Sequence, residues 1–254
     1  MFSETKYSIM LTSLDALVKG YFATVEDSRK KCISEIDEIR KFVFDLNIHF
    51  FSTYKELLGD ANFKRKIVDS LAGICFFELF RSSGHVVFFS ATGLYRNAFD
   101  SIRHMIESII QAAYLDTRHP DIDIETKTAI LKEVEDKFEY HALRLIDSLD
   151  IDFKDRLKHE YRELSRSIHP SHKQIIATIN DILSKPETFH VALVDCKEIS
   201  RIYSSVKKGY DMFFYLFSVC HPEIRLFLKR NSEFLNDVKR FKLPLLASSL
   251  DIKL

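Results

Sequence analysis

The residues best suited to chemistry lie in segment 161–173, which reads YRELSRSIHPSHK. Arg162 and Arg166 are permanent cations, and His169 carries a side chain that gains or loses a proton near neutral pH. A histidine that transfers a proton, beside arginines that neutralise negative charge, is suited to cleaving a phosphate ester. The segment therefore contains candidate catalytic residues for phosphate chemistry.

Helical periodicity predicts how these side chains are positioned. Apolar residues recur with a helical period through the segment and just before it: Leu157, Tyr161, Leu164 and Ile168. The basic residues follow this stripe by one position, so we expect them to flank a buried helix face. Pro170 disfavours helical geometry in the residue before it, so the helix should end near His169.

A second set of charged residues lies on a strongly apolar predicted helix that spans about 86–115. The set alternates in sign at helical spacing: Arg96, Asp100, Arg103 and Glu107. Such a set could line a ligand-binding cleft, or it could form ion pairs within the helix and with a neighbouring helix. In either case we expect it to meet the helix that ends at His169, with Tyr161 and Ser165 near the junction.

The arginine and histidine spacing resembles the Arg-x(4–6)-His motif of the HEPN superfamily (higher eukaryotes and prokaryotes nucleotide-binding). Arg162 and His169 are separated by six residues. The resemblance implies a helical dimer that cleaves RNA without a metal or cofactor. By the same resemblance, Arg162 would hold the scissile phosphate, His169 would act as acid or base, and Arg166 would assist.

A longer resemblance, over about 90–175, joins the helix LYRNAFDSIRHMIESIIQAAYLD to the segment YRELSRSIHPS. The pair is similar to a prokaryotic helical family of unknown function, which implies a fold and no activity. The rival hypothesis is therefore a non-catalytic interaction or scaffold protein, in which the arginines, His169 and the acids form a structural network. We expect a homodimer, RNA is the partner under the first hypothesis, and a protein partner stays unidentified.

Composition predicts an all-α protein. Glycine and proline number only 6 and 5 in 254 residues, too few for the turns of a large β protein. The 22 phenylalanines and 10 tyrosines supply bulk for a core. We predict one domain over 1–254, a bundle of roughly eight to ten helices, in which C-terminal helices over 187–245 pack on the core.

Charge and cysteine content narrow the function classes. The formal net charge is zero, which argues against a binder of nucleic acid through general electrostatics. The four cysteines are far apart and form no CxxC pair, so the sequence suggests neither a zinc site nor a disulfide framework. We expect reduced cysteines, a cytoplasmic location, no metal or cofactor, and no membrane association.

Helix boundaries are expected at several turn signals. Gly59 should end the first long helical region, and residues 82–84 (Ser-Ser-Gly) should separate two apolar helices. His221 and Pro222 should end a long helix that contains the phenylalanine-rich run 213–217, a core or dimer-interface segment. The C-terminal tail from Pro244 shows no clear pattern.

Overall fold

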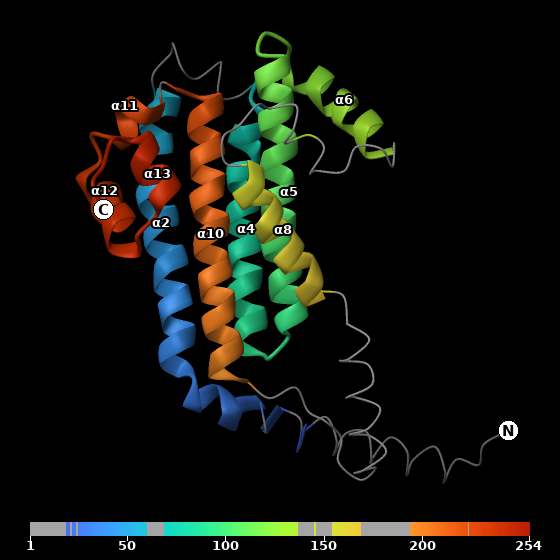
Figure 1. The fold of residues 1–254 in the computed structure, drawn as a ribbon, viewed down its shortest axis with the longest axis vertical. Coiled ribbons are helices and arrows are strands. Elements are labelled where there is room, and N and C mark those ends of the chain that lie inside the picture. The colour runs from blue at the N-terminus through green and yellow to red at the C-terminus, as the bar shows by residue number, and fades with distance from the viewer. Residues whose placement is uncertain are drawn as a thin grey trace, which may run out of the picture.

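The structure is a computed structural model that describes residues 19–20, 22–23, 25–59, 69–136, 145, 154–168, 194–222 and 224–254. Within these ranges every regular element is a helix (Figure 1). The predicted all-α, multi-helix class is therefore confirmed.

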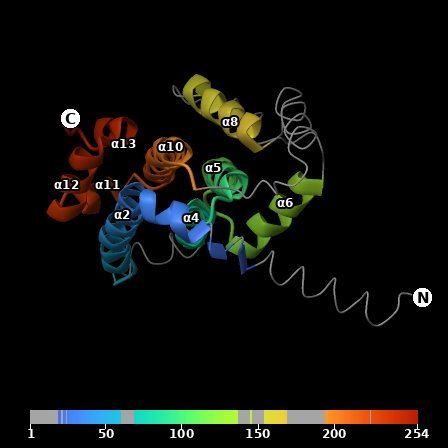
Figure 2. The same cartoon turned by 90° about the horizontal axis from the view of Figure 1, so that it is seen from below.

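Four long helices run side by side along the long axis (Figure 1): α2 (Ile33–Gly59), α4 (Leu71–Ala91), α5 (Tyr95–Arg118) and α10 (Cys196–Cys220). The other described helices are shorter: α6 (Ile124–Asp136), α8 (Lys154–Ile168), α11 (Ile224–Leu228), α12 (Ser232–Phe241) and α13 (Pro244–Ser249). Viewed along the bundle, α5 and α10 lie between α8 on one side and the pair α2 and α4 on the other (Figure 2). The molecule thus has two opposite helical faces.

The central position of α5 follows from its apolar sequence. It packs against α4, α8 and α10, and its buried residues cover much of its circumference: Ala98, Phe99, Ile102, Met105, Ile106, Ile109, Ile110, Ala112 and Ala113. The backbone of α10 approaches it closely at Gly209. A Cβ atom at that position would lie 2.9 Å from Cε of Met105, so glycine permits the contact.

Aromatic rings fill the core between α2, α4 and α10. The ring centroid of Phe50 on α2 lies 4.7 Å from that of Phe76 on α4 and 4.6 Å from that of Phe214 on α10. Each fully buried phenylalanine contributes about 1.5–3 kcal/mol relative to an exposed one. Phe213 and Phe217 are also buried, so this run of α10 belongs to the core and is not a dimer interface.

The boundary between α4 and α5 differs from the prediction. Residues 82–84 lie inside α4, and the chain turns at residues 92–94 instead. The hydroxyl of Ser83 donates to the carbonyl of Phe80 at 2.8 Å, which satisfies this buried polar group within the helix. The actual turn uses Gly93, whose φ of 73° is a left-handed conformation that favours glycine. The predicted helix end at residues 82–84 is therefore wrong.

The C-terminal tail contains a helix that the sequence pattern did not predict. α13 is only six residues long, too short to show a helical period. Pro244 occupies its first turn, where a missing N–H costs nothing. Asp211 of α10 accepts hydrogen bonds from the backbone N–H groups of Leu245 and Leu246 at 3.0 and 2.9 Å. A carboxylate distant in the sequence therefore caps this helix.

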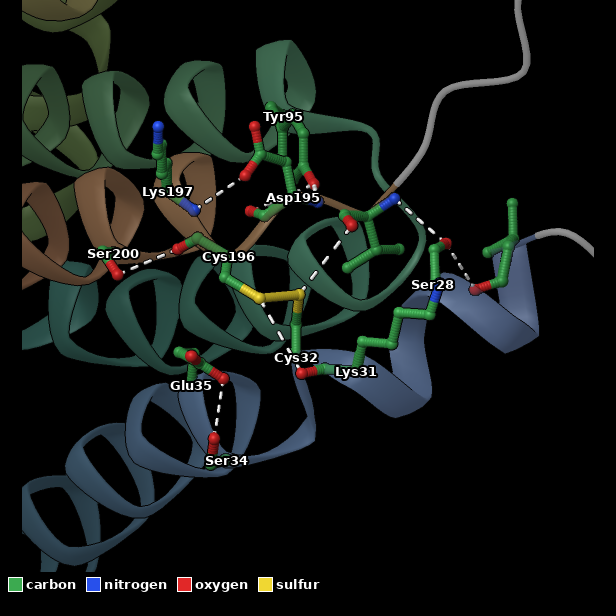
Figure 3. Close-up of a disulfide and its surroundings, with 12 residues drawn as sticks. Ser28, Lys31, Cys32, Ser34, Glu35, Tyr95, Asp195, Cys196, Lys197 and Ser200 are labelled. Atoms are coloured by element: carbon green, nitrogen blue, oxygen red, sulfur yellow. Dashed lines mark hydrogen bonds between the residues drawn. A yellow bond between two sulfur atoms is a disulfide. The ribbon is translucent and has the colours of Figure 1, made fainter.

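A disulfide joins the starts of two long helices (Figure 3). Cys32 lies immediately before α2, and its partner Cys196 is the first residue of α10, 164 positions later. Beside the bond, the backbone N–H of Val194 donates to the hydroxyl of Ser28 at 3.1 Å. The expectation of four reduced cysteines is wrong for this pair, because spacing along the chain cannot reveal a pairing made by tertiary structure.

Candidate functional site

The predicted junction between α8 and α5 is built around Tyr161. The Nε of Arg103 donates to the Tyr161 hydroxyl at 3.1 Å and to a carboxylate oxygen of Glu107 at 3.0 Å. The Tyr161 hydroxyl in turn donates to Glu107, and the Arg103 guanidinium lies 5.0 Å from the tyrosine ring centroid. Three of the predicted site residues thus form one closed hydrogen-bonded set.

The electrostatics of this set keep Tyr161 protonated. Burial raises the pKa of its hydroxyl, and the nearby Glu107 carboxylate raises it further, while Arg103 opposes both effects. A phenol with a raised pKa cannot serve as a base at neutral pH. Since all three side chains are hydrogen-bonded to one another, the arrangement is that of a structural joint between α5 and α8.

The other predicted residues do not enter this set. Arg162 and Arg166 are exposed on α8, and Arg166 forms an ion pair with Glu163 one turn earlier. Ser165 is partly buried on the same helix. Arg96 and Asp100 are exposed near the start of α5.

His169 lies outside the described residues, so the proposed pairing of Arg162 with His169 stays a prediction. α8 is described as far as Ile168, so the predicted helix end near His169 also lies outside the described residues. The stripe that includes Leu157 and Leu164 is buried as predicted.

A buried polar cluster connects four helix ends at the other end of α5. Asp116 of α5 accepts hydrogen bonds from the backbone N–H groups of Leu71 and Ala72, at the start of α4. The ammonium of Lys127 on α6 lies 3.0 Å from the same carboxylate. The hydroxyl of Ser70, the N-cap of α4, donates to Asp116 at 2.7 Å and lies 2.6 Å from Nε2 of His221, which caps α10.

The residue types in this cluster match those of a serine hydrolase, but the geometry does not. In a catalytic triad the imidazole lies between serine and carboxylate, whereas here Ser70 lies between His221 and Asp116. All three are more than nine-tenths buried, so a substrate has no access. The cluster therefore fixes the helix ends, and no sequence signal predicted it because its members come from separate segments.

A cavity of about 550 Å³ lies between α8, α10 and the start of α13. Four cationic residues line it: Arg156, Lys207, Lys208 and Lys242. No sequence pattern predicted this site, because Lys242 lies far along the chain from Arg156 and only the packing of α8 and α13 on α10 brings them together.

An apolar face covers the opposite side of the bundle. Six large side chains on α2 and α4, which we call the phenylalanine face, are each about half exposed or more: Phe44, Ile48, Phe51, Phe77, Phe80 and Phe88. They recur at intervals of three to eight residues on the outer sides of the two adjacent helices. Such a set is unusual on the surface of a monomer.

Two further features of the described chain bear on function. Among the described helices, only α4 has the length and apolarity that a membrane span needs. One side of α4 is nevertheless buried within the bundle, as Phe76, Leu79 and Val86 show. It is therefore a core helix with one apolar outer stripe. In the same parts of the chain, no group of three or more His, Cys, Asp or Glu residues is arranged to hold a metal ion.

Comparison with protein-family models, with curated proteins and with solved structures gives no significant match. The resemblance to the HEPN superfamily remains a prediction that these comparisons do not test.

Proposed function

We propose that the protein is a non-catalytic helical interaction module, and that it forms a homodimer through the phenylalanine face. The observation that carries this proposal is the set of exposed phenylalanines on α2 and α4. Large apolar side chains gain free energy when a partner removes them from water. The occupant we assign is a second copy of the same chain.

The size of the face fits this occupant. A phenylalanine presents roughly 150–250 Å² when fully exposed, and the five in this face are 48–61% exposed. Together they offer about 500 Å² of apolar area, to which Ile48 and the flanking polar residues add. A standard stable interface uses about 800 Å² of each partner. Because the formal net charge is zero, two copies do not repel each other strongly.

The position of this face argues against a composite ribonuclease site. A site shared between two HEPN-like motifs requires the two copies of α8 to face each other. In the bundle, α8 lies on the side of α5 and α10 opposite to α2 and α4 (Figure 2). A dimer joined through the phenylalanine face would hold the two α8 helices far apart. RNA cleavage by Arg162 and His169, and the cytoplasmic location, stay untested proposals.

Light scattering coupled to gel filtration tests the proposal. We expect wild type to elute with twice the mass of one chain over about 10–100 µM, the range of a modest interface. Phe80→Glu should elute as a monomer, because a two-fold axis brings the new carboxylates into an apolar contact. Leu226→Glu on α11 is the matched control, since Leu226 is 59% exposed and lies outside the face.

Melting curves make the outcome decisive. Phe80 is 61% exposed, so its replacement should leave the unfolding of the monomer nearly unchanged. A wild type that is monomeric at 100 µM would reject the homodimer. A monomer that co-sediments with phosphatidylcholine vesicles would assign the face to a membrane surface and would likewise reject it.

A further inference from the structure

The cavity between α8, α10 and α13 contains more positive than negative charge. Its lining carries four cationic side chains and two carboxylates, Glu160 and Asp211. Four minus two leaves an excess of two positive charges. A phosphate monoester carries about −1.5 to −2 at neutral pH, so one such group would neutralise the cavity.

Both carboxylates are already engaged. The ammonium of Lys208 lies 2.7 Å from Glu160 in a salt bridge. Each carboxylate oxygen of Asp211 accepts a hydrogen bond from one backbone N–H group of α13. Of the residues that the structure describes, none forms a salt bridge with Arg156, Lys207 or Lys242. Three cations therefore face one cavity without a salt bridge there, although the charge of Asp211 attracts Arg156 and Lys207.

Lys207 is held in an electrostatically unfavourable position. Partial burial lowers the pKa of its ammonium and the nearby charge of Lys242 lowers it further, while the charge of Asp211 opposes both effects. The Lys207 ammonium also lies 5.6 Å from the ring centroid of Tyr203, which offers it a weak cation–π contact. An anion placed between the two lysines would relieve their repulsion.

Lys242 lies at the point where α12 ends. This residue caps α12 with a φ of 53°, the left-handed conformation that glycine adopts most easily. The backbone N–H of Lys242 bonds to the carbonyls of Val238 and Lys239, so this conformation is that of a common helix C-cap. The conformation places the residue at the cavity wall, beside Leu243 and Pro244.

We propose that the cavity binds a small organic phosphate, with the phosphate group held by Arg156, Lys207 and Lys242. The remaining walls include Tyr203, Met212 and Leu245, which supply a ring and apolar surface for the carbon body of the ligand. The volume lies within the range of ligand pockets, roughly 300–1,000 Å³. This inference does not depend on the proposed dimer, since α2 and α4 do not line the cavity.

Calorimetric titration of the full chain with phenyl phosphate tests the proposal, with inorganic phosphate and phenol as partial probes at constant ionic strength. We expect phenyl phosphate to bind more tightly than inorganic phosphate and phenol not to bind. Lys207→Met and Lys242→Gly should each weaken phenyl phosphate binding about tenfold or more, because each removes a charge-assisted contact. Lys55→Met on α2 should bind as wild type does.

Lys242→Gly separates binding from folding. Glycine prefers the left-handed conformation, so this variant should melt at or above the wild-type temperature while losing affinity. Wild type that binds no phenyl phosphate at 10 mM would overturn the proposal. Unchanged affinity in both Lys207→Met and Lys242→Gly would overturn it as well, because the ligand would then sit elsewhere.

Discussion

The carboxylate of Asp116 and the ammonium of Lys127 form a salt bridge of 3.0 Å in which both side chains are almost fully buried. The ammonium also donates to the backbone carbonyl of Asp69 at 2.8 Å. This pair joins the end of α5 to α6 and to the start of α4. Removing one partner of a buried pair leaves the other charge without compensation.

We therefore predict that Lys127→Met destabilises the protein by about 3 kcal/mol or more. For a chain of this length, that loss corresponds to a fall in melting temperature of roughly 6–12 °C. Lys30→Met is the matched control, because the Lys30–Asp27 pair is exposed and its atoms are 3.6 Å apart. Equal melting temperatures for the two variants would show that the buried pair has no special structural role.

Tyr161→Phe should test the structural interpretation of the α5–α8 joint. The change removes the hydroxyl that links Arg103 to Glu107 and leaves their own ion pair intact. We expect a loss of about 1–2 kcal/mol, measured by urea unfolding. Tyr203→Phe should cost less, because the Tyr203 hydroxyl makes no hydrogen bond with the described part of the chain. A Tyr161→Phe protein as stable as wild type would contradict the joint.

Asp211 should make stability depend on pH in an unusual direction. Burial raises the pKa of its carboxyl above the ordinary value of 3.8, although the backbone N–H groups of α13 oppose the shift. The folded state therefore holds this proton more tightly than the unfolded chain does. The protonated Asp211 carboxyl therefore contributes its full stabilisation of the folded state below pH 3.8. This stabilisation is lost as the pH rises through the raised pKa.

The measurement is the difference in unfolding free energy between wild type and Asp211→Asn, taken at several pH values from about 3.5 to 7. Other titrating groups largely cancel in this difference. We expect wild type to lose stability relative to the variant as pH rises. A difference that grows in favour of wild type with rising pH would show that capping of α13 outweighs burial.

The Cys32–Cys196 bond should contribute strongly to stability. Cross-linking residues that lie 164 positions apart restricts the unfolded chain, and the chain-entropy estimate is about 5 kcal/mol at most. We predict that a reductant lowers the melting temperature of wild type and leaves Cys32→Ser unchanged. Cys75 and Cys220 are free, so a reductant has no bond to break at either residue. Burial raises the pKa of Cys75 to about 12, which keeps its thiol unreactive. Equal melting with and without reductant in wild type would contradict a role for the bond.

The sequence predicted those features that depend on local patterns. Helical periodicity correctly predicted the buried stripe of α8, and composition correctly predicted the all-α class. His221 and Pro222 correctly marked the end of α10. Local signals failed at residues 82–84, because Ser82 and Ser83 satisfy their hydroxyl groups inside α4.

The candidate sites depended on tertiary contacts that no local pattern encodes. The junction of Tyr161 with Arg103 and Glu107 was predictable because periodicity placed each set on one helix face. The basic cavity was not predictable from the sequence. Arg156 lies near the start of α8 and Lys242 directly follows α12, so the two residues are far apart in the chain. The pairing of Cys32 with Cys196 and the capping of α13 by Asp211 escaped prediction for the same reason.

The disulfide also gives the chain a closed covalent topology. Cys32 and Cys196 bound a ring that contains α2, α4, α5, α6 and α8. A protease that cuts the backbone once anywhere between them opens this ring and releases no fragment. The nicked protein would keep its full mass on a denaturing gel and would separate into two pieces only after reduction. Most of the bundle is thus covalently protected against dissociation after a single cleavage.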